Sequence, residues 1–276
     1  MTRAKTMVEA DELRTFMEST ARNAGAVLMS YFGRLEAGDI DFKGRRDLLT
    51  VADRAAEELI VAAISERFPD HSILAEEAAS TDPSASEKAS AAKGYHWIVD
   101  PLDGTTNFVH QLPMFAVSIG LFKNDQPVAG AIYAPRLDEL FFAHEGKGAI
   151  LNGKPIQVSK TTELLDSLLA TGFAYRVGEI AENNLDHFCH LIPRTRAVRR
   201  CGSAAMDLAY TACGRFDGFW ELELSPWDVA AGAVLIREAG GVVTDMNGGD
   251  DWLFGRSIAA ANHGLHPVVL AALNRT

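Results

Sequence analysis

The feature that most constrains the fold is a run of three apolar segments joined by very short polar turns. They read FAVSIGLF, PVAGAIYA and ELFFAHEG, with KNDQ and PRLD between them. Connections this short join antiparallel neighbours, because parallel strands need a crossover of a dozen or more residues. The pair Asn152-Gly153 then favours a type I′ turn and one further hairpin. The middle of the chain is therefore predicted to be an antiparallel meander.

Two helices are predicted before this meander. Apolar residues recur with a helical period over residues 8–32, and Gly33 is a candidate C-cap. Thr50 and Asp53 form the pattern of a capping box, and an apolar helix face follows as far as Phe68. We expect the remaining pieces of this region to be strands at 39–43 and SILAEE and mobile loops at 34–47 and 80–94.

The second half of the chain changes character. Short apolar segments (LLATG, AVRR, DGFWEL, GVVTD, SIAAA) alternate with predicted helices at about 179–191, 203–213, 226–239 and 264–273. Such alternation favours βα units packed in layers. We therefore expect a mixed α/β (α+β) layered fold. It would have two subdomains, residues 1–155 and 156–276, in one compact unit.

Charge limits the partners of the chain. Its formal net charge is −11, which disfavours binding to a nucleic-acid backbone because like charges repel. An acidic protein that handles phosphates would need metal ions between the two. There is no apolar run of about 18 residues to span a membrane and no secretory signal, so a cytoplasmic location is expected.

Acidic residues stand at the ends of predicted buried elements. They are Asp53, the pair Glu76-Glu77, Asp100 and Asp103 in WIVDPLDGTTNF, and Asp228 in SPWDVAAG. Taken singly, each has an ordinary alternative: helix capping, solvation, or turn formation before Gly104. Taken together they match what Mg²⁺ requires, since this ion binds a few carboxylates together with substrate phosphate and water.

The stretch WIVDPLDGTTNF offers groups for both a metal and a phosphate. A backbone turn after Asp100 can return Asp103 to the same point, with the carbonyl of Leu102 between them. Gly104 permits the tight geometry. Thr105 and Thr106 then present hydroxyl and backbone N–H groups near a possible helix N-terminus, where a phosphate can bind.

Rival motifs fail on spacing. An EF-hand beginning at Asp100 would have Leu102 at its third position and Thr105 at its sixth, where Asp or Asn and Gly are required. The chain contains neither GxxxxGK[ST] nor GxSxG. Aspartyl-phosphate enzymes carry aspartates two apart before Gly-Thr, whereas Asp100 and Asp103 are three apart, which disfavours a covalent aspartyl intermediate.

WIVDPLDGTTNF and PWDVAAGAVLIREAGGVVTD resemble the two signature motifs of the inositol monophosphatase family of Mg²⁺-dependent, Li⁺-sensitive sugar-phosphate phosphatases. DLLTVAD, ILAEE, FAVSIGL, GKGAILNG and RRCGSAAMDLAY also follow in the family's order and spacing. The resemblance covers nearly the whole chain and is greatest to the bacterial inositol-1-monophosphatase branch. It implies a layered α-β-α-β-α sandwich and a homodimer.

The resemblance also implies roles for single residues. Two or three Mg²⁺ ions would be held by the carboxylates of Glu76, Asp100, Asp103 and Asp228 and the carbonyl of Leu102. Asp53 and Thr105 would orient and deprotonate the attacking water, with Glu76 also counted as catalytic. The phosphate would be bound by Gly104, Thr105 and Thr106. The polyol would be contacted by Gly202, Ser203, Ala204, Glu221 and Asp228, and Lys43 would lie on the loop that approaches the site.

The implied reaction is the hydrolysis of a phosphorylated polyol, most simply inositol 1-phosphate to inositol and phosphate. A water activated by metal attacks phosphorus in line while metal stabilises the leaving alkoxide. Relatives act on histidinol phosphate, fructose 1,6-bisphosphate or 3′-phosphoadenosine 5′-phosphate, so these substrates stay open. A regulatory relative associated with RNA or transcription is the alternative from another functional class.

Overall fold

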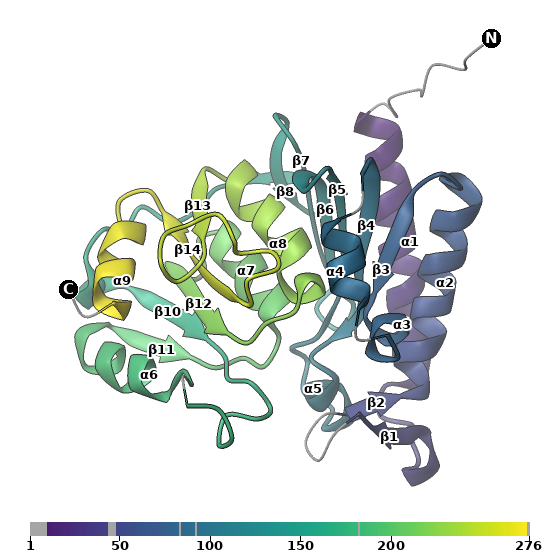
Figure 1. The fold of residues 1–276 in the computed structure, drawn as a ribbon, viewed down its shortest axis with the longest axis horizontal. Helices are drawn as coiled ribbons and strands as arrows, with labels where there is room; N and C mark the ends of the chain where they lie inside the picture. Colours follow the sequence, from purple (N-terminus) through teal and green to yellow (C-terminus); the bar gives the residue numbers. More distant parts are fainter. Residues whose placement is uncertain (1–9, 44–47, 83, 92, 182, 275–276) are drawn as a thin grey trace.

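The computed structural model describes residues 10–43, 48–82, 84–91, 93–181 and 183–274. Its elements stack as a layered α-β-α-β-α sandwich, as expected (Figure 1). Helices α1 (Ala10–Tyr31) and α2 (Val51–Arg67) cover one face of a seven-stranded sheet. Helices α7 (Ala204–Ala212) and α8 (Pro226–Glu238) lie between this sheet and a five-stranded one. Helices α6 (Leu185–Leu191) and α9 (His266–Leu273) form the outermost layer.

The seven-stranded sheet contains the predicted meander. Its strands run in the order of the chain: β3 (Ser72–Ala75), β4 (Tyr95–Asp103), β5 (Ala116–Lys123), β6 (Gln126–Ala134), β7 (Glu139–His144), β8 (Gly148–Leu151) and β9 (Lys154–Ile156). Every neighbouring pair is antiparallel except β3 and β4. At the β8–β9 turn, Asn152 (φ 48°) and Gly153 (φ 77°) both have the positive φ that a type I′ turn requires.

The five-stranded sheet has a crossed order, β11-β10-β12-β14-β13. Its strands are β10 (Leu168–Thr171), β11 (Ala197–Arg199), β12 (Gly218–Leu222), β13 (Gly241–Thr244) and β14 (Ser257–Asn262). Strand β10 runs parallel to both β11 and β12, so their carboxyl ends meet at one edge. This edge faces the end of β4 that bears the acidic stretch (Figure 1).

Short elements complete the described chain. Strands β1 (Ile40–Phe42) and β2 (Leu48–Thr50) pair antiparallel, and the second of them was not expected. The short helices are α3 (Glu76–Ser80), α4 (Ala85–Ser90) and α5 (Thr105–Val109), with 3₁₀ turns at Ala37–Asp39, Leu164–Asp166 and Ile192–Arg194. Two parts of these predictions lie outside the described residues. They are the start of the first helix, residues 8 and 9, and the end of the loop 34–47, residues 44–47.

Helix α8 is the central packing element because apolar residues surround it on nearly all sides. At Gly130 on β6, a Cβ would lie 2.6 Å from the carbonyl oxygen of Ala231, so only glycine lets the helix approach this closely. The buried alanines Ala230, Ala231 and Ala233 belong to the core between the two sheets. This packing fixes the first turn of α8, which carries Asp228, against the seven-stranded sheet.

Three sequence predictions about local structure were wrong. Residues 80–94 contain helix α4, because Ala85 and Ala89 pack one turn apart against the core between the sheets. The helix predicted at 179–191 begins only at Leu185. SILAEE is a strand only to Ala75, and the two glutamates open helix α3.

The division into subdomains at residue 155 remains a prediction. Strand β9 spans that position and completes the seven-stranded sheet. Within the described ranges, none of the helices has the length and apolar character needed to cross a membrane.

Candidate active site

A β-bulge in β4 places two aspartates on the same side of the strand. Asp100 pairs with Ser118 and Asp103 with Ala116, so a step of three residues on β4 faces a step of two on β5. In a regular strand, residues three apart would point to opposite faces, and the extra residue of a bulge reverses this. The sequence predicted a turn after Asp100. The structure reaches the same convergence inside a continuous strand, where Pro101 lacks the N–H for a regular ladder.

Asp228 joins these two residues from the other half of the chain. It lies on the first turn of α8, where its Oδ2 accepts a hydrogen bond of 2.7 Å from the backbone N–H of Ser225. Carboxylate oxygens of Asp100, Asp103 and Asp228 all lie within 4.8 Å of one another. Oxygens this close can be ligands of one hard divalent cation, which prefers carboxylates.

The electrostatics of this group fit a bound cation. Burial raises the pKa of Asp100 well above its ordinary value, and the negative charges of Glu76, Asp103 and Asp228 raise it further. Burial likewise raises the pKa of Asp228 well above its usual range. For Asp103, burial raises the pKa to about 6 although hydrogen bonds from Ser203 and Ala205 oppose the shift. Positive charge at this point would relieve the repulsion, so the residues present fit Mg²⁺.

Lys43 lies beside the glutamate pair. Its Nζ is 2.8 Å from Oε1 of Glu76 and 2.8 Å from Oε1 of Glu77. Burial lowers the pKa of the Lys43 ammonium, but the two carboxylates raise it by more, so the ammonium stays charged. Glu76 is therefore paired with a lysine and lies outside the group of three aspartates, and its role as a metal ligand remains a prediction.

Asp53 and Thr105 are hydrogen-bonded neighbours. The hydroxyl of Thr105 lies 3.1 Å from Oδ1 of Asp53 and 3.1 Å from the carbonyl oxygen of Leu102. The other carboxylate oxygen of Asp53 accepts the backbone N–H of Thr50, which completes the predicted capping box. Burial raises the pKa of Asp53 to about 6, above its ordinary value near 4.

The segment predicted to bind phosphate begins a helix. Gly104 has a φ of +96° and is the N-cap of α5, which contains Thr105 and Thr106. A Cβ at Gly104 would lie 2.9 Å from the carbonyl oxygen of Met114, so only glycine fits the turn. The first backbone N–H groups of α5 consequently lie directly after Asp103 in the chain.

The predicted polyol contacts come from the segment that opens α7, from β12 and, for Asp228, from α8. Ser203 caps α7, followed by Ala204, and its hydroxyl donates to Oδ2 of Asp103 at 2.6 Å. Glu221 on β12 is 8% exposed, and among the described residues no donor is hydrogen-bonded to its carboxylate. Burial raises its pKa well above the ordinary value, and the charges of Asp207 and Asp228 add to the effect.

Sequence reasoning missed two residues that hold the site together. Asn107 donates from Nδ2 to the carbonyl oxygens of Met114 (2.6 Å) and Cys201 (2.8 Å), which ties α5 to the segment before α7. Glu57 accepts the backbone N–H groups of Glu77 (2.8 Å) and Ala78 (2.9 Å). Asn107 stood inside the quoted motif, and Glu57 lies one helical turn after Asp53, so spacing alone could have suggested the second.

A model of the inositol monophosphatase family matches residues 9–276. The chain belongs to the inositol monophosphatase family. It is 44% identical to an inositol-1-monophosphatase of Synechocystis sp. over 99% of this chain and 93% of the relative. It is 42% identical to Nus factor SuhB of Pseudomonas aeruginosa, over 88% of each. The solved inositol monophosphatase of Anabaena (Nostoc) sp. superposes with a TM-score of 0.84, at 43% identity and 98% coverage of both chains. The family and the names of the Synechocystis and Anabaena proteins support a phosphatase.

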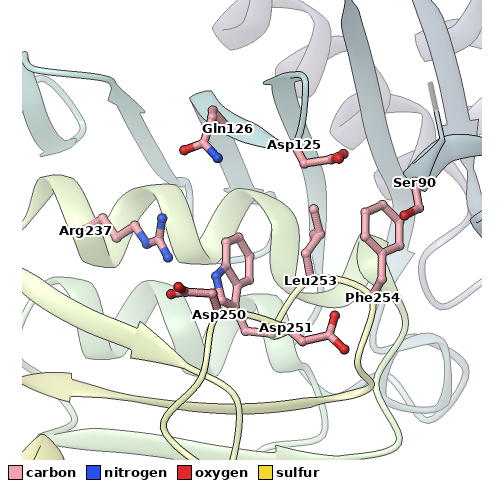
Figure 2. A pocket seen from close by; sticks show the side chains of 9 residues that line it. Ser90, Asp125, Gln126, Arg237, Asp250, Asp251, Leu253 and Phe254 are labelled. Atoms are coloured by element: carbon pink, nitrogen blue, oxygen red, sulfur yellow. The ribbon is translucent and has the colours of Figure 1, made fainter. Parts of the chain in front are cut away.

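This member of the inositol monophosphatase family also has a cavity away from the group of Asp100, Asp103 and Asp228. It has a volume of about 390 Å³ and lies near the last turn of α8, where Arg237, Asp250 and Trp252 are among its lining residues. Figure 2 shows Asp125 and Phe254 on the side of the cavity away from Arg237. Arg237 lies nine positions after Asp228 on this helix, which is roughly 14 Å along the axis. The candidate active site and this cavity are therefore at opposite ends of α8.

Proposed function

We propose that this chain is a Mg²⁺-dependent phosphate monoester hydrolase that converts inositol 1-phosphate into inositol and phosphate. The observation that carries the proposal is the group of three aspartates whose carboxylate oxygens lie within 4.8 Å of one another. The choice of substrate is supported by the name of the Synechocystis relative, inositol-1-monophosphatase.

The metal ligands would come from both halves of the chain. Two or three Mg²⁺ ions would be held by the carboxylates of Glu76, Asp100, Asp103 and Asp228 and the carbonyl of Leu102. When bound, such ions offset the charge of the phosphate, lower the pKa of the attacking water and stabilise the leaving alkoxide. The capping box at Ser225 and the hydrogen bonds from Ser203 and Ala205 hold two of these carboxylates in place.

Asp53 and Thr105 would handle the proton of the attacking water. Thr105 can accept that proton on its hydroxyl oxygen while its own proton moves to Oδ1 of Asp53, 3.1 Å away. With a pKa of about 6, the Asp53 carboxylate is ionised at neutral pH and is still basic enough to accept a proton. The backbone N–H groups from Gly104 to Thr106 would bind the phosphate oxygens meanwhile.

Residues around Glu221 would recognise the alcohol that leaves. Polyol hydroxyls are hydrogen-bond donors, and the Glu221 carboxylate is a buried acceptor without a hydrogen-bonded donor in the described part of the chain. Gly202, Ser203 and Ala204 come from the neighbouring segment and would contribute backbone groups. A homodimer and a cytoplasmic location also remain predictions, which rest on the family resemblance and on the sequence.

A panel of esters tests the proposal. Release of phosphate from inositol 1-phosphate, histidinol phosphate, fructose 1,6-bisphosphate, 3′-phosphoadenosine 5′-phosphate and phenyl phosphate is measured with Mg²⁺ and with EDTA. We expect Mg²⁺-dependent turnover and the highest kcat/KM for inositol 1-phosphate. A higher value for histidinol phosphate would overturn the substrate. If none of the esters is hydrolysed, a regulatory role like that suggested by the name Nus factor SuhB becomes the better proposal.

A further inference from the structure

Gly172 makes an unusually close contact with Glu221. A Cβ built on Gly172 would lie 2.2 Å from each carboxylate oxygen of Glu221 and 2.3 Å from its Cδ, and these are its three nearest heavy atoms. The φ of Gly172 lies outside the left-handed region, so its backbone could belong to any residue. The obstacle to a side chain here is therefore the carboxylate itself.

A buried hydrogen-bond network prevents the two strands from moving apart. Thr171 at the end of β10 is paired in register with Trp220 on β12, and its hydroxyl donates to the Trp220 carbonyl at 2.6 Å. Asn184, which is 2% exposed, donates to the Gly172 carbonyl at 2.7 Å and accepts the indole N–H of Trp220 at 2.7 Å. The backbone of Gly172 is thus fixed relative to the residue that precedes Glu221.

The direction of the Glu221 side chain depends on this contact. Because these hydrogen bonds hold the backbone and the carboxylate is the flexible end of its side chain, a side chain at position 172 would force the carboxylate into another rotamer. The acidic neighbours Asp207 and Asp228 repel it, while Arg200 attracts it. A buried acceptor of this kind must find donors in a ligand or in water, so its orientation decides which donors it can meet.

We propose that Gly172 is a positioning residue for polyol specificity, because it leaves room for the Glu221 carboxylate in the orientation that accepts substrate hydroxyl groups. This inference rests on the proposed function, since it assumes that Glu221 contacts the alcohol part of the ester. The three heavy atoms nearest to a Cβ at Gly172 all belong to Glu221, and none belongs to a proposed metal ligand or to Gly104, Thr105 or Thr106. The effect of Gly172 is therefore confined to esters whose alcohol bears hydroxyl groups.

The test compares two esters in the Gly172→Ala variant. The polyol phosphate that the wild type hydrolyses best is compared with phenyl phosphate, whose alcohol has no further hydroxyl groups. We expect KM for the polyol ester to rise roughly tenfold or more, in keeping with loss of a hydrogen bond to a buried carboxyl group. We expect kcat for that ester, and both constants for phenyl phosphate, to stay within about twofold.

Gly178→Ala is the matched control. Gly178 lies in the same segment, its φ is not left-handed, and a Cβ there would meet nothing within 4 Å. This variant should leave the kinetics on both esters unchanged. An equal KM change on both esters in Gly172→Ala, or no change on either, would overturn the inference.

A double variant separates steric positioning from a general loss of structure. Glu221→Asp shortens the side chain by one methylene group and withdraws the carboxylate from position 172. Adding Gly172→Ala to Glu221→Asp should then raise KM for the polyol ester by less than about twofold. The same substitution should raise it roughly tenfold in the wild-type background. Additive effects would contradict the contact. If Gly172→Ala alone does not fold, recovery of folding in the double variant supports the inference, and failure to recover overturns it.

The outcomes also distinguish this inference from the proposed function. If the wild type hydrolyses no polyol phosphate, the proposed function fails, and the inference fails with it. If the wild type prefers a polyol ester and Gly172→Ala leaves that preference unchanged, only the inference about Gly172 is wrong.

Discussion

The part of the site proposed to face metal and phosphate and the part proposed to face the alcohol are built in different ways. Residues 100–106 place two carboxylates and two hydroxyls within one short stretch, shaped by a bulge and the first turn of α5. The alcohol-facing part is gathered from the end of β10, the segment before α7 and β12. The positions of the groups proposed for phosphate chemistry are thus determined by nearby residues in the chain. The positions of the groups proposed for substrate choice depend on the register of distant strands.

The largest effect should come from the local part. Asp100→Asn keeps the Oδ1 that accepts the N–H of Leu102 but removes a charge from the proposed metal ligands. We expect the rate of phosphate release with Mg²⁺ to fall by about 10³-fold or more on every ester. The reason is that this carboxylate would hold the ion that stabilises the charge of the transition state. Rates with inositol 1-phosphate and phenyl phosphate measure this.

The same substitution should stabilise the metal-free protein. Asp100 is a buried carboxylate whose neighbours repel its charge, so its neutral analogue removes that repulsion. In EDTA at pH 8 we expect a Tm a few °C above that of the wild type, from about 1 kcal/mol of stabilisation. Asp166→Asn, which changes an exposed carboxylate, is the control and should alter neither rate nor Tm. An Asp100→Asn variant with normal activity would remove this residue from the site.

A smaller effect is expected where the two parts are joined. Asn107→Ala removes the amide that bridges α5 to Cys201, and it deprives the part-buried carbonyl oxygens of Met114 and Cys201 of this donor. We expect a loss of about 1–3 kcal/mol in the free energy of unfolding and a fall in kcat/KM of roughly tenfold. Urea unfolding and steady-state kinetics measure the two quantities.

The Asn107→Ala variant also tests whether the phosphate-facing and alcohol-facing parts of the site act independently. If kcat/KM falls as much for phenyl phosphate as for a polyol ester, Asn107 aligns the residues from Gly104 to Thr106 as well as those proposed to face the alcohol. A fall in kcat/KM for the polyol ester alone would show that the two parts act independently. Asn274→Ala, at an exposed amide near the C-terminus, is the control.

The smallest effect on activity is expected from pH and metal as they act on the stability of the folded protein. Burial raises the pKa of Asp53 and of Asp103 to about 6 in each case and that of Glu77 to about 8. Each folded-state pKa exceeds the unfolded value near 4, so the unfolded chain releases its protons first. The stability of the metal-free protein should therefore fall as pH rises from about 4 to about 8.

Mg²⁺ should reverse much of this loss. At pH 8 we expect Mg²⁺ to raise Tm by about 3–8 °C over the value in EDTA. At pH 5 the rise should be smaller, because the ions must displace protons from the carboxylates. Scanning calorimetry at both pH values measures the difference. An equal rise at pH 5 and pH 8 would contradict the assignment of these carboxylates to a metal site.

The predictions that succeeded concern patterns within a few residues. The capping box of Thr50 and Asp53 and the turn at Asn152-Gly153 need no information from elsewhere in the chain. The helix in 80–94 was missed because Ala85 and Ala89 gain their stability from a core that other segments supply. The late start of α6 follows from Asn184, which is held in a buried network with Trp220.

The sequence by itself determined which groups are available for chemistry: the spacing of Asp100 and Asp103, the glycine after them, and an aspartate on the first turn of a helix. Tertiary structure decided how those groups meet. The bulge opposite β5 turned two carboxylates to one side, the packing of α8 on Gly130 brought Asp228 to them, and the pairing of β10 with β12 set Gly172 against Glu221. The physical reason is that side-chain type and turn geometry are local properties of the chain. Strand register and the close approach of a helix arise only when distant apolar faces are buried together.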